Sequence, residues 1–230
     1  MSNSQTVEQI SLDKLAEYQA IARILHNVFC LYPETELVEG FKENAVAATW
    51  PKFKQTTANQ QGRDALNNYL GQWNVEQMND LKVDYGQLFY GPGEPIAIPQ
   101  GSAYLGEAQV HFDASTIALI DFYKQHGVNF SLDMPQPVDH LGLFFAVLDS
   151  SFERLINADN DEDSDSQSLK QFIQVLLQQH LLPWAGRCLD IALEHAETDF
   201  YRGVSLLASD YLAELTDAFN VIPMPRKLFR

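Results

Sequence analysis

The sequence predicts an all-α protein, a single domain of about eight to ten helices. In most segments, apolar residues recur with the 3.6-residue period of an α-helix. No segment alternates apolar and polar residues in the way that is typical of a half-buried strand. Hydrophobic residues make up 46% of the 230 residues, which is enough for a large core without a metal or a disulfide. We therefore expect residues 1–230 to fold as one domain.

Four helices are expected before the first long loop. The first follows Ser11, a good N-cap residue, and ends before Pro33. The second spans residues 34–48 and ends before Trp50-Pro51. The third and the fourth are marked by apolar residues at helical spacing, which are Leu66, Tyr69, Leu70 and Trp73 in the third and Val75, Met78, Leu81, Tyr85, Leu88 and Phe89 in the fourth.

The helical pattern breaks in residues 91–102, which contain three glycines and three prolines. Neither a helix nor a central strand tolerates that density. Helical spacing resumes at Thr116, and Gly127 is expected to follow the end of this helix as its C′ residue. Residues 131–138 form a Pro-containing joint that is predicted to act as a hinge. The next helix carries Leu141, Phe144, Phe145, Leu148, Phe152 and Leu155.

The acidic, Ser-rich residues 158–168 are predicted to form a solvated loop. Three more helices are expected after it, around residues 167–180, 183–195 and 199–219. Pro183 suits the first turn of its helix, where the missing N–H has no intrahelical partner to lose. The ending, from residue 221 onwards, is basic and interrupted by prolines.

The chain is strongly acidic, with 15 Lys+Arg against 31 Asp+Glu and a formal net charge of −16. This balance disfavours nucleic acid as a partner, because phosphates require a basic face, and it favours cationic partners. Only two cysteines are present, Cys30 and Cys188, which excludes a disulfide scaffold and a zinc ribbon. The sequence starts without a secretory signal, and no apolar run approaches the ~20 residues of a membrane span. We expect a cytoplasmic protein that does not span a membrane.

The usual catalytic signatures are missing from the sequence. It contains neither a phosphate-binding P-loop, nor the H-E-x-x-H zinc motif, nor the G-x-S-x-G nucleophile elbow. The chain is therefore predicted to be a binding protein and not an enzyme, with no cofactor, no catalytic residue and no metal site.

Two loops hold the residues best suited to bind a ligand. In residues 85–104, glycines permit close backbone approach, prolines limit the entropy lost on binding, and aromatic residues flank both. Such a segment suits an extended peptide better than a phosphate, although its aromatics would equally suit a stiff connector packed on the core. In residues 134–140, Asp139 is expected to cap the following helix, and His140 to hold a proton or donate to a neighbouring loop.

At these residues the sequence resembles the TorD/DmsD family of redox-enzyme maturation chaperones. Four blocks carry the resemblance, and the ending from Ile222 to Arg230 resembles the DmsD branch most closely. The blocks are Asp84-Tyr85-Gly86-Gln87-Leu88-Phe89-Tyr90-Gly91-Pro92 with Pro99-Gln100-Gly101-Ser102, then Pro137-Val138-Asp139-His140, then His180-Leu181-Leu182-Pro183-Trp184, and finally Phe200-Tyr201-Arg202.

The resemblance implies a TorD-like helical chaperone that binds the twin-arginine signal peptide of a DMSO-reductase-type molybdoenzyme catalytic subunit. Such a chaperone holds the apo subunit back from the Tat translocase until its molybdenum cofactor is installed. Gln100 stands where DmsD-like relatives commonly carry Trp, and Gln136 replaces a usual Glu, so the preferred leader stays open. The residues that the resemblance assigns to peptide binding are Tyr85, Leu88, Phe89, Gly91, Pro92, Pro99, Gly101, Ser102, Tyr104, Pro137, Asp139 and His140.

A twin-arginine leader offers two adjacent guanidinium groups followed by an apolar segment. Arginine pairs with carboxylates and stacks on aromatic rings. We expect Asp139 to supply charge and His140 to orient the joint. The apolar surface is expected to come from Tyr85, Phe89 and Tyr104.

Two alternative functions stay open at this point. One is a switch protein with weak GTP binding, since guanine-nucleotide binding is reported for some family members. The other is a module that binds the folded apoenzyme independently of its leader. The client stays open too, as does the choice between a monomer and a domain-swapped dimer hinged at residues 131–138.

Overall fold

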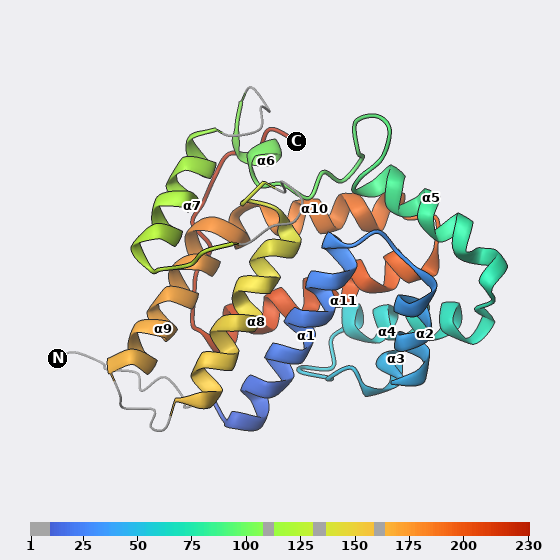
Figure 1. Ribbon diagram of the computed structural model, residues 1–230, viewed down its shortest axis with the longest axis horizontal. Helices are drawn as coiled ribbons and strands as arrows, with labels where there is room; N and C mark the ends of the chain where they lie inside the picture. Colours follow the sequence, from blue (N-terminus) through green and yellow to red (C-terminus); the bar gives the residue numbers. More distant parts are fainter. Residues whose placement is uncertain (1–9, 108–112, 131–136, 159–163) are drawn as a thin grey trace.

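The computed structural model describes residues 10–107, 113–130, 137–158 and 164–230. Within these residues, all regular secondary structure is helical (Figure 1), which confirms the all-α prediction. The helices enclose one apolar core to which almost every helix contributes.

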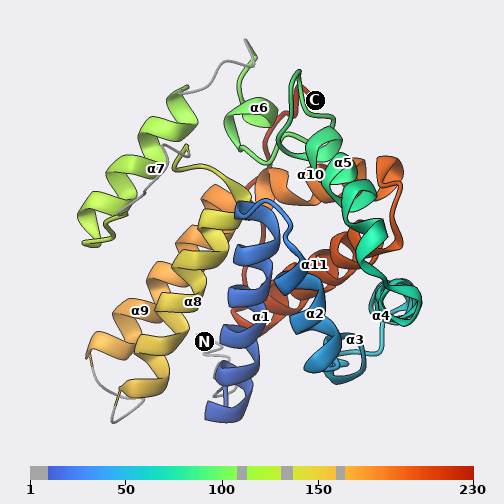
Figure 2. The same ribbon diagram turned by 45° about the vertical axis from the view of Figure 1, so that its right-hand side comes forward.

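Helices α1 (Leu12–Cys30) and α8 (Leu141–Asn157) lie side by side, as Figures 1 and 2 both show. Ser11 caps α1 through its side chain, as predicted. The two helices approach closely at Gly142, where a Cβ atom would overlap the sulfur of Cys30. A larger residue at this position would push the start of α8 away from α1.

Helices α4 (Thr57–Gln72) and α11 (Asp199–Ala218) form the other close pair. Their backbones meet at two facing glycines. A Cβ atom on Gly203 would lie 2.8 Å from the carbonyl oxygen of Gly62 and 2.9 Å from the amide nitrogen of Leu66. The absence of side chains at this crossing is what permits the contact.

The single helix predicted over residues 34–48 is wrong. The structure has two helices there, α2 (Thr35–Glu43) and α3 (Val46–Thr49). Ala45 between them adopts a left-handed conformation with φ of 48°, which breaks the helical hydrogen-bond ladder. Alanine favours helices, so nothing local in the sequence predicts this break.

Helix α5 (Met78–Leu88) follows a 3-10 turn (Val75–Gln77). The glycine- and proline-rich residues after it are not helical, as expected, and they arch beside the end of α5 in Figure 1. The N–H of Ile96 donates to the carbonyl of Gln87 at 2.9 Å. This bond ties the loop back onto the helix.

A short helix, α6 (Ser102–Leu105), precedes α7 (Ala114–Gln125). Asp113 caps α7, and Gly127 takes a left-handed φ of 67° just after it, as predicted. Most of the predicted hinge, residues 131–136, lies outside the described residues.

The predicted acidic loop over residues 158–168 is partly wrong. Its central residues, 159–163, lie outside the described residues, but helix α9 (Ser164–Val175) begins inside the predicted loop. The chain then continues without a break through a π-helical segment, η2 (Leu176–Leu181), into α10 (Leu182–His195). The two helices expected here are therefore joined.

The π-helical segment explains how the helix accommodates Pro183. The N–H of Leu182 donates to the carbonyl of Leu177, five residues back. With the same spacing of five residues, the hydrogen bond to the carbonyl of Gln178 would have to come from Pro183, but proline has no N–H to donate. The carbonyl of Gln178 instead accepts the N–H of Met224, at 2.9 Å.

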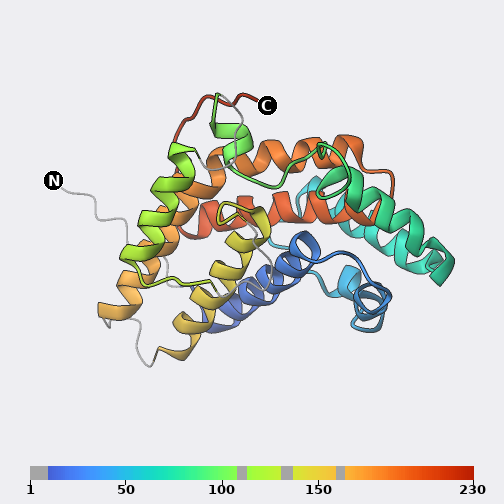
Figure 3. The same cartoon turned by 45° about the horizontal axis from the view of Figure 1, so that its top comes forward.

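Figure 3 shows α10 and α11 one above the other, with the segment that follows α11 passing on toward α6. Among the described residues, no helix combines the length and the apolar character that crossing a membrane requires.

Candidate functional site

The two predicted binding loops lie side by side. Gln100 and His140 form an isolated antiparallel bridge. The N–H of Gly101 donates to the carbonyl of Asp139 at 3.0 Å, and the N–H of Leu141 donates to the carbonyl of Pro99 at 2.7 Å. The structure thus joins two loops that α6 and α7 separate in the sequence.

Asp139 is buried, with 3% of its surface exposed. One carboxylate oxygen, Oδ2, accepts the N–H of Ser102 at 2.7 Å and the hydroxyl of Thr116 at 3.3 Å. It therefore fastens the start of α6 to α7, and the prediction that Asp139 caps α8 is wrong. Its other oxygen, Oδ1, is buried and accepts no hydrogen bond from the described residues. A buried carboxylate oxygen without a donor is costly, because the charged oxygen has lost its hydration without gaining a protein partner.

His140 is the residue that caps α8. Its Nδ1 accepts the N–H of Gly142 at 3.1 Å. Burial, together with a smaller contribution from nearby His26, lowers the pKa of His140 to about 4. The imidazole is therefore neutral near pH 7, and the expectation that His140 holds a proton there is wrong. Through this cap the ring fixes the start of α8 next to the joint.

The aromatic residues expected to supply an apolar surface lie in the core. Tyr85, Phe89 and Tyr104 are 3%, 2% and 0% exposed, and Leu88 is also fully buried. Phe89 packs edge-on against Phe29 with ring centroids 5.3 Å apart. These side chains therefore fit the alternative interpretation of residues 85–104, which is a stiff connector that packs its aromatic residues on the core. Pro99, Gly101 and Ser102 are buried as well.

The outer side of the same loop is apolar and exposed. A surface groove of about 820 Å³ runs along it, and Gly91 and Pro92 of the predicted site line this groove. The exposed apolar residues that line it are Tyr90, Tyr32, Val83 and Ile96. Sequence reasoning missed these residues. Tyr90 directly follows Phe89, and the local sequence does not show that one of these two neighbours is exposed and the other buried.

Residues of the first three matched blocks line a smaller cavity, of about 260 Å³. Gly101 and Asp139 line it with Trp184, while His180 and Arg226 stand at the same cavity. A Cβ atom on Gly101 would lie 2.9 Å from Nε1 of Trp184, so glycine lets the indole pack against this turn. Pro137, the remaining predicted residue, is half-buried beside this joint.

Trp184 and His180 belong to the third block, but sequence reasoning left them out of the site. Trp184 stacks on Tyr104 with centroids 5.5 Å apart and donates from Nε1 to the carbonyl of His180 at 2.8 Å. Burial lowers the pKa of His180 to about 4, and the nearby charge of Arg226 adds to the effect. Their membership of a matched block was the signal that could have identified them.

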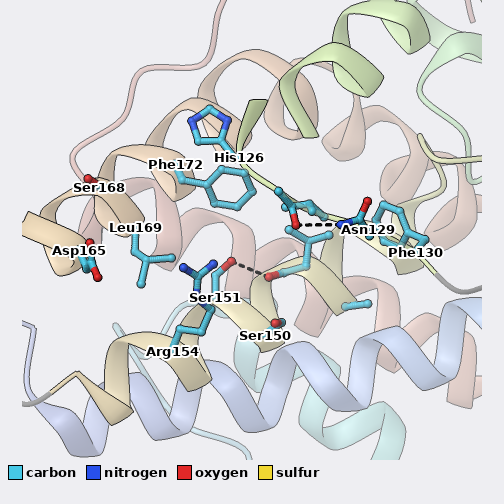
Figure 4. Close-up of a pocket in the computed structure, with 14 residues that line it drawn as sticks. His126, Asn129, Phe130, Ser150, Ser151, Arg154, Asp165, Ser168, Leu169 and Phe172 are labelled. Atoms are coloured by element: carbon cyan, nitrogen blue, oxygen red, sulfur yellow. Dashed lines mark hydrogen bonds between the residues drawn. The ribbon is translucent and has the colours of Figure 1, made fainter. Parts of the chain in front are cut away.

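Figure 4 shows another cavity, of about 530 Å³, between α7, α8 and α9. None of the predicted site residues lines it. Two of its polar side chains bind backbone close to them in sequence: Ser151 donates to the carbonyl of Val147 at 2.7 Å within α8, and Asn129 donates to that of Gly127 at 3.3 Å. Among the described residues, no group of His, Cys, Asp and Glu side chains is arranged to hold a metal ion, here or elsewhere.

The sequence model of the nitrate reductase delta subunit family matches residues 53–190. This range contains the loop residues, Asp139 and Trp184. The Tat proofreading chaperone DmsD of Salmonella typhimurium is 29% identical over 222 residues, which cover 93% of this chain and 96% of the relative.

Two further relatives match over a shorter range. The probable Tat proofreading chaperone DmsD of Haemophilus influenzae is 33% identical over 128 residues, or 56% of each chain. The chaperone protein TorD of Pasteurella multocida is 32% identical over 130 residues, which cover 56% of this chain and 58% of the relative.

Proposed function

This chain belongs to the nitrate reductase delta subunit family, the family of TorD, and from that membership we propose that it is a cytoplasmic chaperone for a molybdoenzyme catalytic subunit. The membership confirms the resemblance that the four sequence blocks indicate. In this proposal the chain binds the twin-arginine leader of the apo subunit. It withholds the leader from the Tat translocase until the cofactor is in place, and it acts by binding and not by catalysis.

The observation that supports leader binding most directly is the free oxygen of Asp139. Oδ1 is buried, lacks a donor among the described residues, and belongs to a residue that lines the cavity between three matched blocks. A guanidinium group supplies the charged donors that such an oxygen needs. Arginine also stacks well on aromatic rings, and Trp184 lines the same cavity.

The exposed groove along the glycine- and proline-rich loop suits the apolar part of the leader. Tyr90 and Val83 expose 64% and 43% of their surfaces there. Exposed apolar side chains that line one groove provide a surface on which an apolar peptide segment can pack. The net charge of −16 would speed the encounter with a basic leader.

Calorimetric titration of the full chain with a twin-arginine leader peptide tests the proposal. The control peptide carries glutamine in place of both arginines. We expect saturable binding of the first peptide, affinity at least about tenfold weaker for the second, and weaker binding of the first as salt rises. Equal affinity for both peptides, or no binding of either, would contradict the proposal.

Two further binding measurements distinguish this function from the two alternatives. Tight binding of GTP in the absence of leader would favour a nucleotide switch. Undiminished binding of a client subunit whose leader has been deleted would favour a module that recognises the folded subunit.

A further inference from the structure

Residues 224–230 follow α11 and cross the matched blocks as an extended stretch of chain without regular structure (Figure 3). The N–H of Met224 donates to the carbonyl of Gln178 at 2.9 Å, and the N–H of Phe229 donates to the carbonyl of Tyr104 at 2.9 Å. The first acceptor belongs to the π-helical segment and the second to α6. The molecule thus already holds a peptide segment by its backbone at this place.

Arg230 is held by the glycine- and proline-rich loop. Its Nη1 donates to Oε1 of Glu94 at 2.6 Å, and its Nη2 donates to the carbonyls of Pro95 and Ile96 at 2.9 and 3.2 Å. Only 20% of the Arg230 side chain is exposed. The loop therefore presents three oxygens in an arrangement that binds a guanidinium group.

The chemistry of this segment is that of a twin-arginine leader. Two adjacent cations, Arg226 and Lys227, precede the apolar residues Leu228 and Phe229. Arg226 lies at the cavity that Asp139 lines. Leu228 is half-buried and packs against the core.

We propose that residues 224–230 occupy in cis part of the leader-binding surface, from the cavity that Asp139 lines to the carbonyls of Pro95 and Ile96 beside the exposed groove, and that a twin-arginine leader displaces them when it binds. This inference rests on the proposed function and adds an internal competitor to it. The segment is held by two backbone hydrogen bonds, by the contacts of the Arg230 guanidinium with three oxygens, and by a hydrogen bond from Nε of Arg187 to the Arg230 carbonyl at 3.3 Å. Each of these contacts contributes little net free energy, because a single hydrogen bond replaces one to water and the Glu94 carboxylate is largely exposed. The attachment is nevertheless intramolecular, so its effective concentration is high.

With such a competitor, the apparent affinity for the leader equals the intrinsic affinity multiplied by the fraction of time that this surface is free. A segment docked nine-tenths of the time would weaken leader binding about tenfold. A peptide with weaker cationic or apolar character would fail to displace the segment, so the competitor would sharpen the discrimination between leaders and other basic peptides.

Leader titration of three chains tests the inference. The first ends at Pro223, the second carries Arg230→Ala in the full chain, and the control carries Lys42→Ala, which removes an exposed charge on α2 away from the groove. We expect leader affinity to rise about tenfold in the first chain and by a smaller factor in the second, with no increase in the control. Equal leader affinity in all of these chains and the unmodified one would overturn the inference and leave the proposed function intact.

A second arm separates failure of the inference from failure of the function. A synthetic peptide of residues 224–230 is titrated into the chain that ends at Pro223, beside a peptide of scrambled order. Saturable binding of the native order alone, in competition with leader, supports the inference, and no binding overturns it. If the leader binds neither the full nor the shortened chain, the proposed function is contradicted. The titration with the synthetic peptide still decides whether residues 224–230 bind to this surface. If the shortened chain does not fold, the leader affinity of Arg230→Ala, compared with that of the unmodified chain, decides the same question.

Discussion

The carboxylate of Asp139 accepts the backbone N–H of Ser102 at 2.7 Å, across 37 positions of the sequence. This contact fastens the two loops that sequence analysis predicted separately as parts of one site. It uses a single oxygen of the carboxylate, and the other oxygen is buried without a donor among the described residues. Asp139 therefore stabilises the joint, and in the proposed function it also offers its charge to the leader.

The substitution Asp139→Asn should separate those two roles. The amide side chain would retain an oxygen for the N–H of Ser102, but it would present no negative charge to an arginine. We expect leader affinity to fall at least about tenfold in calorimetry, because a charge-assisted hydrogen bond is lost. The matched control is Asp84→Asn, since Asp84 is fully buried but accepts the N–H groups of Glu197 and Thr198, directly before α11. The control should lose stability and keep leader affinity; unchanged affinity in Asp139→Asn would remove Asp139 from the site.

Replacement of Tyr90 by alanine should weaken leader binding without weakening the fold. Tyr90 is 64% exposed and lines the apolar groove, so few of its contacts are internal. We expect an affinity loss of about fivefold to thirtyfold, measured by calorimetry, because truncation of an aromatic anchor commonly costs about 1–2 kcal/mol of binding free energy. Val75→Ala is the control, since Val75 is also 64% exposed but lies outside this groove. If both variants bind the leader as tightly as the unmodified chain, the apolar segment docks elsewhere.

Replacement of Gly203 by alanine should destabilise the whole fold. The new Cβ atom would lie 2.8 Å from the carbonyl oxygen of Gly62, which is backbone and cannot move alone. Overpacking of this kind costs about 1–3 kcal/mol, which urea unfolding would measure. Gly186→Ala in α10 is the control, because no atom lies within 4 Å of its added Cβ. The control should be neutral or up to about 1 kcal/mol more stable, and equal effects of the two substitutions would contradict the close packing of α4 and α11.

The stability of the chain should fall as the pH decreases from about 6.5 toward about 4. Burial lowers the pKa of His140 from its usual 6.5 to about 4, so the unfolded chain binds more protons than the folded one between these values. The part of the stabilisation that is due to His140 is complete above pH 6.5 and is lost as the pH falls, by roughly 2 kcal/mol at pH 5. His180, whose pKa is also lowered to about 4, adds a loss of the same sign. Urea unfolding at pH 7 and pH 5 would measure the loss.

His140→Asn should reduce this dependence on pH. Asparagine can accept the N–H of Gly142 as an N-cap residue, but it does not titrate. The control is His195→Asn, because His195 is exposed at the end of α10. An unchanged pH profile in His140→Asn would show that this imidazole is not the group responsible.

Local sequence signals predicted the parts of the fold that depend on neighbouring residues. Ser11 caps α1 and Gly127 follows α7 in the left-handed conformation, because both effects act within one turn of helix. The break at Ala45 and the continuity of the helix through Pro183 were not predictable in this way. The second depends on the N–H of Met224, which lies beyond the end of α11 and replaces the donor that proline lacks.

The helical fold, the family and the segments that make up the candidate site follow from the sequence alone. Hydrophobic periodicity, cap residues and the four blocks are properties of the chain in order, and they need no packing to be recognised. Packing in three dimensions selected which side chains of those segments face a ligand. Phe89 and Tyr90 are adjacent, yet one is 2% and the other 64% exposed, because α5 ends at Leu88 and the core accepts only the side that meets Phe29. The burial of Asp139 has the same origin, since Ser102, which donates to its Oδ2, is close in space and distant in sequence.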